Sequence, residues 1–210
     1  MRLVLASASP ARHATLRAAG ITAEVRVSGV DEDAALAAAG STGPAGDVVV
    51  LARAKAEAVA AGLARQDAVV LGCDSLLEID GEGFGKPVDA ADATARWRRM
   101  RGRSGVLHTG HWLVDARTAD GAGRGTGTLG ATASTTVHFA ELSDAEIDAY
   151  VATGEPLAVA GAFTVDGLGG PFVTAIDGDY HTVVGVSLPL LRELLGELGV
   201  AVTELWTTRA

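Results

Sequence analysis

The chain has 210 residues, 48% of them hydrophobic and 20% charged, and a formal net charge of −9 at pH 7. This composition is typical of a soluble folded protein, and no apolar run approaches the roughly 18 residues that span a bilayer. The negative charge argues against a large nucleic-acid surface, which needs a basic face. The single cysteine, Cys73, excludes an intramolecular disulfide and a cysteine-cluster zinc site. We expect the cytoplasmic chain 1–210 to form one domain or two lobes that share one sheet, with no membrane segment.

Strand and helix patterns alternate along the chain. Apolar and β-branched runs predict strands at 2–6, 23–28, 68–73, 76–80, 105–115, 130–139 and 172–177. Helical patterns with capping residues predict helices at 10–19, 47–64, 89–101, 143–153 and 187–198. The Asp-Gly pair in "IDGEG" (79–83) predicts a hairpin turn, because such turns need positive φ angles. The alternation predicts an α/β fold with a mixed, twisted sheet and flanking helices.

Four patterns that suggest binding sites fail on their context. "GTGTLG" (125–130) matches the dinucleotide-binding fingerprint, but a β-branched run follows it, so we interpret it as the loop of a long hairpin. "GFGKP" (83–87) lacks the Ser/Thr and the helix of a P-loop. His108 and His111 stand three apart on a predicted strand and point to opposite faces, so no shared metal ion is expected. The basic run 96–103 is interpreted as a solvated helix end.

The first helix carries an arginine in an unfavourable position. Ser9 is a good N-cap and Pro10 suits the first helical position, so Arg12 falls in the first turn. The positive end of the helix dipole disfavours a cation there. An anion bound at the helix start would make Arg12 its second clamp, whereas this stretch alone is equally consistent with an exposed arginine.

A lysine interrupts the apolar stripe of the 47–64 helix. At 100° per residue, Lys55 lies in the middle of the stripe that includes Leu51 and Val59, while Arg53 points away. An unpaired ammonium facing a core is costly, so Lys55 is expected to face a cleft or an anion. The alternative is a side chain whose stem lies flat and whose head reaches solvent.

Two acidic groups follow predicted strands. Asp74 and Ser75 come where a buried strand should end, a common place for ligand groups in open α/β sheets. Glu32 lies in "VDED" (30–33) after the second strand. Each has a plain alternative, a turn residue for Asp74 and a solvated acidic turn for Glu32. Together with Arg12, Lys55 and Lys86, however, they supply the cations and the oxygen ligands that phosphoanhydride chemistry requires.

The order of these motifs resembles the Maf family of nucleoside triphosphate pyrophosphatases. The matching stretches are "LASASPARHATL", "VDED", "LARAKAEAV", "GCDS", "GKP", "AGAFTVDGLGG", "LSDAEIDAYVATGEP", "IDGDY" and "VVGVSLPLL", which run from residue 3 to about 198. The resemblance implies an elongated mixed sheet with a cleft between two lobes, like the inosine-triphosphate pyrophosphatases. It also implies cleavage of the α–β bond of nucleoside triphosphates with a divalent metal, removal of noncanonical nucleotides and a link to cell-division arrest.

The resemblance implies roles for individual residues. Ser7, Arg12, Lys55 and Lys86 match the phosphate-binding positions of the family, Glu32 its acidic metal-site position, and Asp74 the carboxylate assigned as proton acceptor. Departures occur at His13, where many members have arginine, at Ser75, where they have threonine, and at Asp166, where they have glutamine. Val159 replaces a common lysine. These departures bear on base recognition, so the preferred base stays open, and the "DGLGG" stretch is similar to an actinobacterial branch.

The expected mechanism needs Mg²⁺ or Mn²⁺ bound by Glu32 and Asp74, with Arg12, Lys55 and Lys86 holding the triphosphate. An ordinary aspartate pKa of about 4 would make Asp74 a poor base, so metal activation of the water is expected to supply much of the effect. Whether Asp74 acts mainly as base or as ligand stays open. The expected partner is a nucleoside triphosphate, without nucleic acid or membrane, and a homodimer is left open. A non-catalytic nucleotide sensor that regulates division and a nucleotidyltransferase are the alternative functions.

Overall fold

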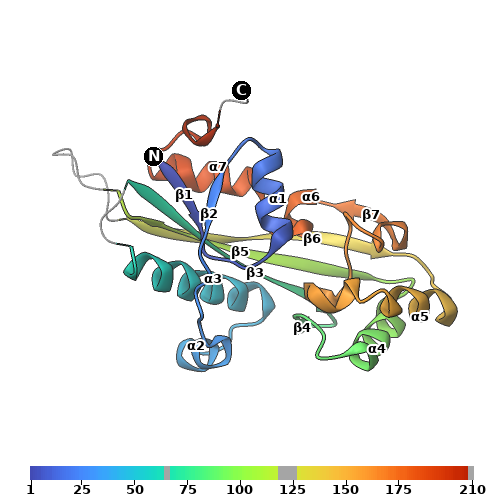
Figure 1. The fold of residues 1–210 in the computed structure, drawn as a ribbon. Helices are drawn as coiled ribbons and strands as arrows, with labels where there is room; N and C mark the ends of the chain where they lie inside the picture. Colours follow the sequence, from blue (N-terminus) through green and yellow to red (C-terminus); the bar gives the residue numbers. More distant parts are fainter. Residues whose placement is uncertain (64–66, 118–126, 208–210) are drawn as a thin grey trace.

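The computed structural model describes residues 1–63, 67–117 and 127–207 as one long mixed sheet with helices on both faces (Figure 1). The strands are β1 (Arg2–Leu5), β2 (Ala23–Val25), β3 (Ala68–Ile79), β4 (Glu82–Phe84), β5 (Ser104–Asp115), β6 (Thr128–Phe139) and β7 (Val173–Asp177). The helices are α1 (Pro10–Ala18), α2 (Glu32–Ala39), α3 (Pro44–Ala61), α4 (Ala90–Met100), α5 (Asp144–Ala152), α6 (Tyr180–Val184) and α7 (Leu188–Glu197).

The predicted α/β class is confirmed, with local differences. The strands predicted at 68–73 and 76–80 form one strand, β3, since the polar pair at its centre stays extended. Helices α2 and α6 were not predicted, because both are short and lack a clear apolar stripe. Helix α3 begins at Pro44, before the predicted start at 47, so Asp47 lies in its first turn.

Sheet order is β2-β1-β3-β5-β6-β7, with β4 paired to β3. Strands β1, β2 and β3 are mutually parallel, and the β3–β5–β6–β7 pairs are antiparallel. The predicted turn at 79–83 joins β3 to β4 and has positive φ at Asp80 and Gly81. The "GTGTLG" stretch runs into β6, as the hairpin interpretation requires, although residues 118–126 lie outside the described part.

One edge of β3 has an opening at its centre. Strand β5 pairs along the other edge of β3 from Val69 to Glu78 without interruption. On the opening's edge, β1 pairs with residues 68–71 and β4 pairs with residues 77–79. Within the described part of the chain, residues 72–76 therefore have no strand neighbour on that edge, and Asp74 lies in the middle of this segment.

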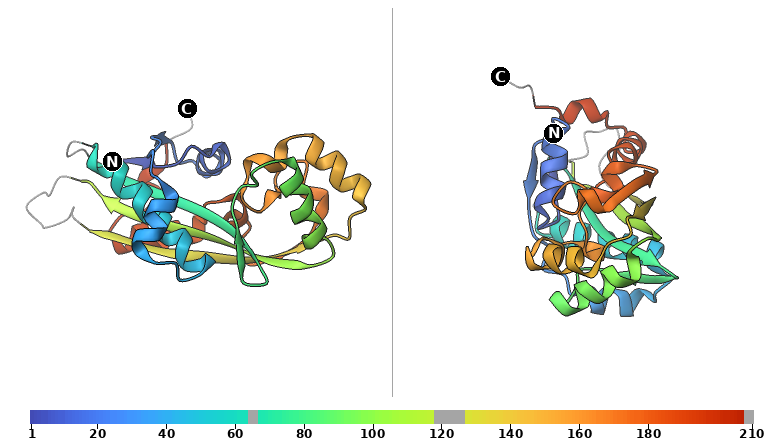
Figure 2. Two further views of the ribbon diagram at one scale, coloured as in Figure 1. Left: turned by 90° about the horizontal axis from the view of Figure 1, so that it is seen from below. Right: turned by 90° about the vertical axis from the view of Figure 1, so that its right-hand side faces the viewer.

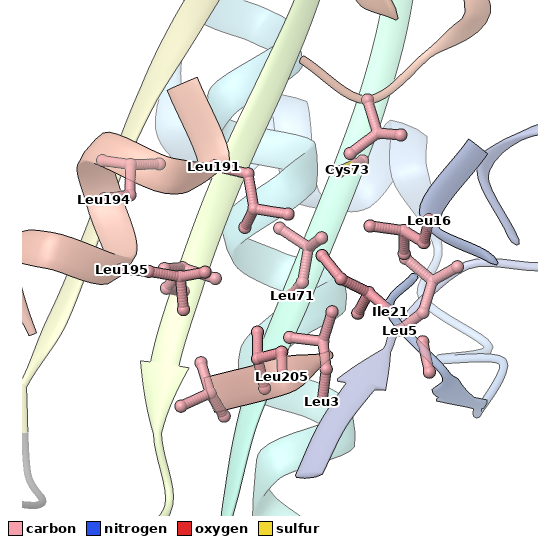
Figure 3. Packing of buried hydrophobic residues seen from close by; sticks show 14 of the residues in the cluster. Leu3, Leu5, Leu16, Ile21, Leu71, Cys73, Leu191, Leu194, Leu195 and Leu205 are labelled. Atoms are coloured by element: carbon pink, nitrogen blue, oxygen red, sulfur yellow. The ribbon is translucent and has the colours of Figure 1, made fainter. Parts of the chain in front are cut away.

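The two faces of the sheet are covered differently. Alternate β3 residues point to opposite faces: Leu71 and Cys73 pack with α1 and α7 (Figure 3), and Leu77 packs with α4 and α5 on the same face. Figure 2 shows α4 and α5 gathered at one end of the long sheet. Val70 faces the other side and packs against α3. The division into two lobes stays a prediction.

Helix α3 lies unusually close to the sheet. A Cβ atom at Gly72 would stand 2.1 Å from the Ala52 carbonyl oxygen, and one at Gly110 would stand 2.2 Å from that of Val48. The two glycines thus let the backbone of α3 approach β3 and β5 directly, which carries Lys55 to the level of Asp74. Within the described ranges no single helix has the length and apolarity of a membrane span, and α2 and α3 reach them only as a pair bent by 116°.

Candidate active site

Arg12 is held in a cradle of uncharged oxygens. Ser9 caps α1 by accepting a hydrogen bond from the Arg12 N–H, as expected. The half-buried guanidinium donates four hydrogen bonds of 2.8–2.9 Å, to the carbonyls of Gly185 and Cys73 and to the hydroxyls of Ser7 and Ser75. A guanidinium has five N–H donors, so one stays available on Nη2. No described Asp or Glu forms an ion pair with Arg12, and its charge therefore remains available to an anion. The alternative of a freely exposed arginine does not hold.

A chain of hydroxyl groups extends this cradle into the sheet. Ser75 Oγ lies 2.9 Å from Thr109 Oγ1, which donates to the Thr182 carbonyl at 2.8 Å. Arg12 and the carbonyl fix the direction of every proton, since the guanidinium can only donate and the carbonyl can only accept. The chain therefore runs Arg12 to Ser75 to Thr109 to Thr182. Thr109 is fully buried, and its hydroxyl links the arginine cradle to α6.

Lys55 joins two carboxylates at the opening in the edge of β3. Its ammonium lies 2.5 Å from Asp74 Oδ1 and 2.7 Å from Glu32 Oε1. The Lys55 side chain is only 12% exposed, whereas Arg53 is 58% exposed and pairs with Glu57 on the outer face. The prediction that Lys55 faces a cleft or an anion is confirmed. Asp31 caps α2, which presents Glu32 from its first turn.

Burial raises the pKa of Asp74 above its ordinary value. Its side chain is 13% exposed, and loss of solvation outweighs the opposing effects of Lys55 and then Arg12, while Glu32 adds to the rise. The expectation of an ordinary pKa for Asp74 is therefore wrong, because the pKa is raised. A carboxylate with a raised pKa accepts a proton more readily, which favours Asp74 as a base.

The described structure does not bring every predicted residue to this centre. Lys86 is exposed on the segment after β4, and the neighbouring Gly85 carbonyl accepts a hydrogen bond from the Gly161 N–H. His13 lines a separate surface hollow beside Arg17. Ser75 belongs to the Arg12 cradle. Asp166 lines a cavity between α1 and α6. The three positions predicted for base recognition therefore lie in three different surroundings.

The other histidines and the basic run have structural roles. His108 contacts Glu78 and Ser134, whereas His111 accepts a hydrogen bond from the Ser187 N–H on the other face, as predicted. The arginines of the 96–103 run pair with carboxylates at the surface, which confirms the interpretation as a solvated helix end. The paired carboxylates are those of Asp80, Glu82, Asp92 and Asp144.

The thiol of Cys73 is inert, because burial raises its pKa to about 12.

Two carboxylates form the oxygen-ligand set that the described residues offer to a metal. No group of three or more His, Cys, Asp or Glu side chains clusters in residues 1–63, 67–117 and 127–207. Glu32 and Asp74 are near enough to contact one ammonium, that of Lys55. A Mg²⁺ ion typically takes one or two carboxylates and completes its shell with water and substrate phosphates. The pair fits such an ion.

Sequence reasoning missed Thr109 and the carbonyls of α6. The only signal for Thr109 was its place between the two histidines of "HTGH", and its contact with Thr182 spans 73 residues. A hydroxyl in a strand gives no indication of its partner until the fold is known. The charged groups of the site are therefore recognisable in the sequence, whereas the neutral groups that orient them are not.

Comparison with known proteins agrees with the motif analysis. A family model described as "Maf-like protein" matches residues 2–198. A nucleoside triphosphate pyrophosphatase from Salinispora tropica is 60% identical over 99% of this chain and 88% of its own. Proteins of the same name from Streptomyces avermitilis and Nocardia farcinica are each 56% identical, over 99% and 97% of this chain and 96% of their own. The three relatives are actinobacterial, as the "DGLGG" stretch suggested. The chain belongs to the Maf family.

Proposed function

We propose that this protein hydrolyses nucleoside triphosphates at the α–β bond, releasing a nucleoside monophosphate and pyrophosphate. The observation that carries the proposal is that one opening in the sheet brings two features together. They are Arg12, which has no carboxylate partner among the described residues, and the Lys55–Asp74–Glu32 group. Anion binding and proton acceptance are thus available side by side. The names of the relatives support the same reaction.

Arg12 binds the phosphates in this proposal. Its spare Nη2 donor and the N-terminus of α1 both favour an anion, and Ser7 holds the guanidinium in place. Because four of its N–H groups are already bonded, the arginine pays little ordering cost when the substrate arrives. Lys86 projects from the segment after β4 and supplies a third cation to the phosphates of the bound substrate.

Asp74 accepts the proton of the attacking water. Oxygen from this water bonds to the α-phosphorus, the α–β bridging bond breaks, and pyrophosphate leaves with the bridging oxygen. Lys55 and Arg12 offset the negative charge that grows on the leaving group. Lys55 also opposes the rise in the pKa of Asp74 that burial causes, which favours the ionised carboxylate.

Glu32 and Asp74 would hold the divalent ion, Mg²⁺ or Mn²⁺. Such an ion withdraws charge from a phosphate and acidifies a bound water. Lys55 contacts both carboxylates, so it is positioned to exchange one of these contacts for a substrate phosphate.

The proposal includes the cellular role that the family resemblance implies. This role is the removal of noncanonical nucleotides, with a link to cell-division arrest.

Incubation with a panel of nucleoside triphosphates and Mg²⁺ tests the proposal. Monophosphate and pyrophosphate in equal amounts are expected, with loss of both in Asp74→Asn. Binding without turnover would support a nucleotide-sensing regulator instead, and a nucleotide attached to an acceptor would support a nucleotidyltransferase. Gel filtration of the same sample tests the homodimer, and cell fractionation the cytoplasmic location.

A further inference from the structure

The segment between β4 and α4, residues 85–88, lies at the rim of the opening in the edge of β3. A Cβ atom at Gly85 would lie 3.5 Å from the side chain of Leu76. Leu76 stands two positions after Asp74 on β3, so their side chains share one face of the sheet. Lys86 follows Gly85 directly, and its side chain is exposed, with no hydrogen bond or ion pair inside the described ranges. This cation is therefore available to a phosphate at the rim.

Two side chains of α4 hold the backbone of this segment, which belongs to no strand or helix. Arg96 donates from Nη1 to the Gly85 carbonyl at 2.6 Å and from Nη2 to the Lys86 carbonyl at 3.5 Å. The Asp92 carboxylate accepts a hydrogen bond from the Val88 N–H at 3.0 Å. The peptide groups on both sides of the Lys86 Cα atom are thus tied to α4.

Arg96 and Asp92 also hold each other in one geometry. The Nε and Nη2 atoms of Arg96 donate to the two carboxylate oxygens at 2.9 and 2.7 Å, which makes a bidentate pair one helical turn apart. The guanidinium lies 5.2 Å from the centre of the Phe84 ring, at the end of β4, and Figure 1 shows α4 beside this strand. The Arg96 side chain is 13% exposed, against 51% for Arg98 on the same helix. This support is complete before any ligand binds.

The support depends on the shape of the guanidinium as well as on its charge. Five N–H donors in a fixed fork let Arg96 bind Asp92 and the Gly85 carbonyl at once, whereas an ammonium is a single charge on a flexible stem. The hydrogen bond from Arg96, followed by that from the Val88 N–H, lowers the pKa of Asp92. The carboxylate is therefore ionised at neutral pH, and the pair stays intact there.

We propose that Arg96 is a positioning residue for Lys86, which it holds at the rim of the opening for contact with the phosphates of the substrate. The inference rests on the proposed function, because it takes Lys86 to bind phosphate. An irregular segment that was free to move would have to be ordered each time a substrate bound, and this cost would weaken the phosphate contact. Arg96 supplies the order in the folded chain and touches no substrate itself.

A double-mutant cycle between Arg96 and Lys86 tests the proposal. The two measurements are kcat/KM for a nucleoside triphosphate with Mg²⁺, and the calorimetric Kd for inorganic tripolyphosphate, which requires no turnover. Lys86→Ala should weaken both by about tenfold or more, the range for one charge-assisted contact. Arg96→Met should weaken both by about three- to tenfold in the unaltered chain, and by less than about twofold once Lys86 is alanine. The matched control Arg98→Met removes an exposed charge of the same helix and should change neither.

Arg96→Lys separates position from charge, because it keeps the cation and loses the fork. It should weaken tripolyphosphate binding nearly as much as Arg96→Met and show the same dependence on Lys86, and it carries the cycle if Arg96→Met does not fold. Full binding by Arg96→Lys, or equal losses from Arg96→Met with and without Lys86, would overturn the proposal. A general loss of stability would give the second of these results.

The two measurements also separate this proposal from the proposed hydrolysis. If Arg96 and Lys86 are coupled in tripolyphosphate binding while no triphosphate is hydrolysed, the positioning role stands and the hydrolysis fails. If monophosphate and pyrophosphate form at the same rate in Lys86→Ala as in the unaltered chain, the hydrolysis stands and the positioning role fails.

Discussion

Replacing Lys55 with methionine should displace the pH dependence of the reaction. Methionine keeps the apolar stem of the side chain and removes its charge. The ammonium lies 2.5 Å from Asp74 and 2.7 Å from Glu32, so its loss leaves two neighbouring carboxylates without their shared cation. Both the missing attraction and the remaining repulsion favour protonated Asp74, whose pKa is already raised.

The size of the effect follows from the closeness of the pair. An opposite charge within a few ångströms typically shifts a pKa by about one to three units, so the pKa of Asp74 should rise by that amount in Lys55→Met. A base is lost as pH falls through its pKa, and the acid limb of the kcat/KM profile therefore moves up by at least about one unit. Turnover at neutral pH should fall at least about tenfold, or roughly 1.4 kcal/mol of barrier.

The assay is the pH profile of kcat/KM for Lys55→Met beside Arg53→Met, whose charge lies on the same helix but faces solvent. The control should keep both its rate and its acid limb.

The pH dependence of stability follows from the same shift in the pKa of Asp74. This pKa is higher in the folded than in the unfolded chain, so Asp74 favours folding most at low pH. This contribution to the free energy of unfolding declines as pH rises through the folded pKa. Equal losses in both variants, or an unmoved acid limb in Lys55→Met, would refute the assignment of Lys55 and Asp74.

Three further predictions concern the hydroxyl chain, the metal and the packing of α3. Thr109→Val removes the acceptor of Ser75 and should lower kcat/KM about tenfold, whereas Thr109→Ser should keep most of it; equal activity of the two variants would contradict the chain. Dialysis against a chelator should abolish turnover and Mg²⁺ should restore it, with Glu32→Gln needing more Mg²⁺ than the unaltered chain; unchanged turnover after dialysis would count against the metal. Gly72→Ala should lower the free energy of unfolding by about 1–3 kcal/mol or more, because the Ala52 carbonyl blocks the new Cβ atom. Gly196→Ala has no described atom within 4 Å of its new methyl group and should raise the free energy of unfolding by about 0.5–1 kcal/mol. Urea unfolding measures both variants, and similar changes in the free energy of unfolding would contradict the close packing of α3.

The charged part of the site could be predicted from the sequence because it follows from local patterns. The helical period places Lys55 on the buried stripe of α3, and the end of an apolar run marks Asp74. Arg12 stands out because a cation is unfavourable at a helix start. All three positions are recognisable from the residues within one element and its immediate neighbours.

The remaining parts depend on contacts between distant segments. The opening in the edge of β3 exists because β1 ends at Leu5, opposite Leu71, and β4 ends at Phe84, opposite Leu77, and neither boundary has a strong local signal. The uncharged cradle of Arg12 includes the Gly185 carbonyl, 173 residues away. The raised pKa of Asp74 depends on burial by α3, which the two close-packing glycines permit. No local sequence pattern encodes these contacts between distant segments.

Hydrolysis in ¹⁸O-labelled water tests most directly the claim that Asp74 directs water to the α-phosphorus. With a nucleoside triphosphate and Mg²⁺, phosphorus NMR should locate one ¹⁸O atom per turnover in the phosphate of the nucleoside monophosphate, and the pyrophosphate should remain unlabelled. Label in the pyrophosphate would mean attack at the β-phosphorus, and release of a nucleoside diphosphate with inorganic phosphate would mean cleavage of the wrong bond. Either result would contradict the proposed reaction.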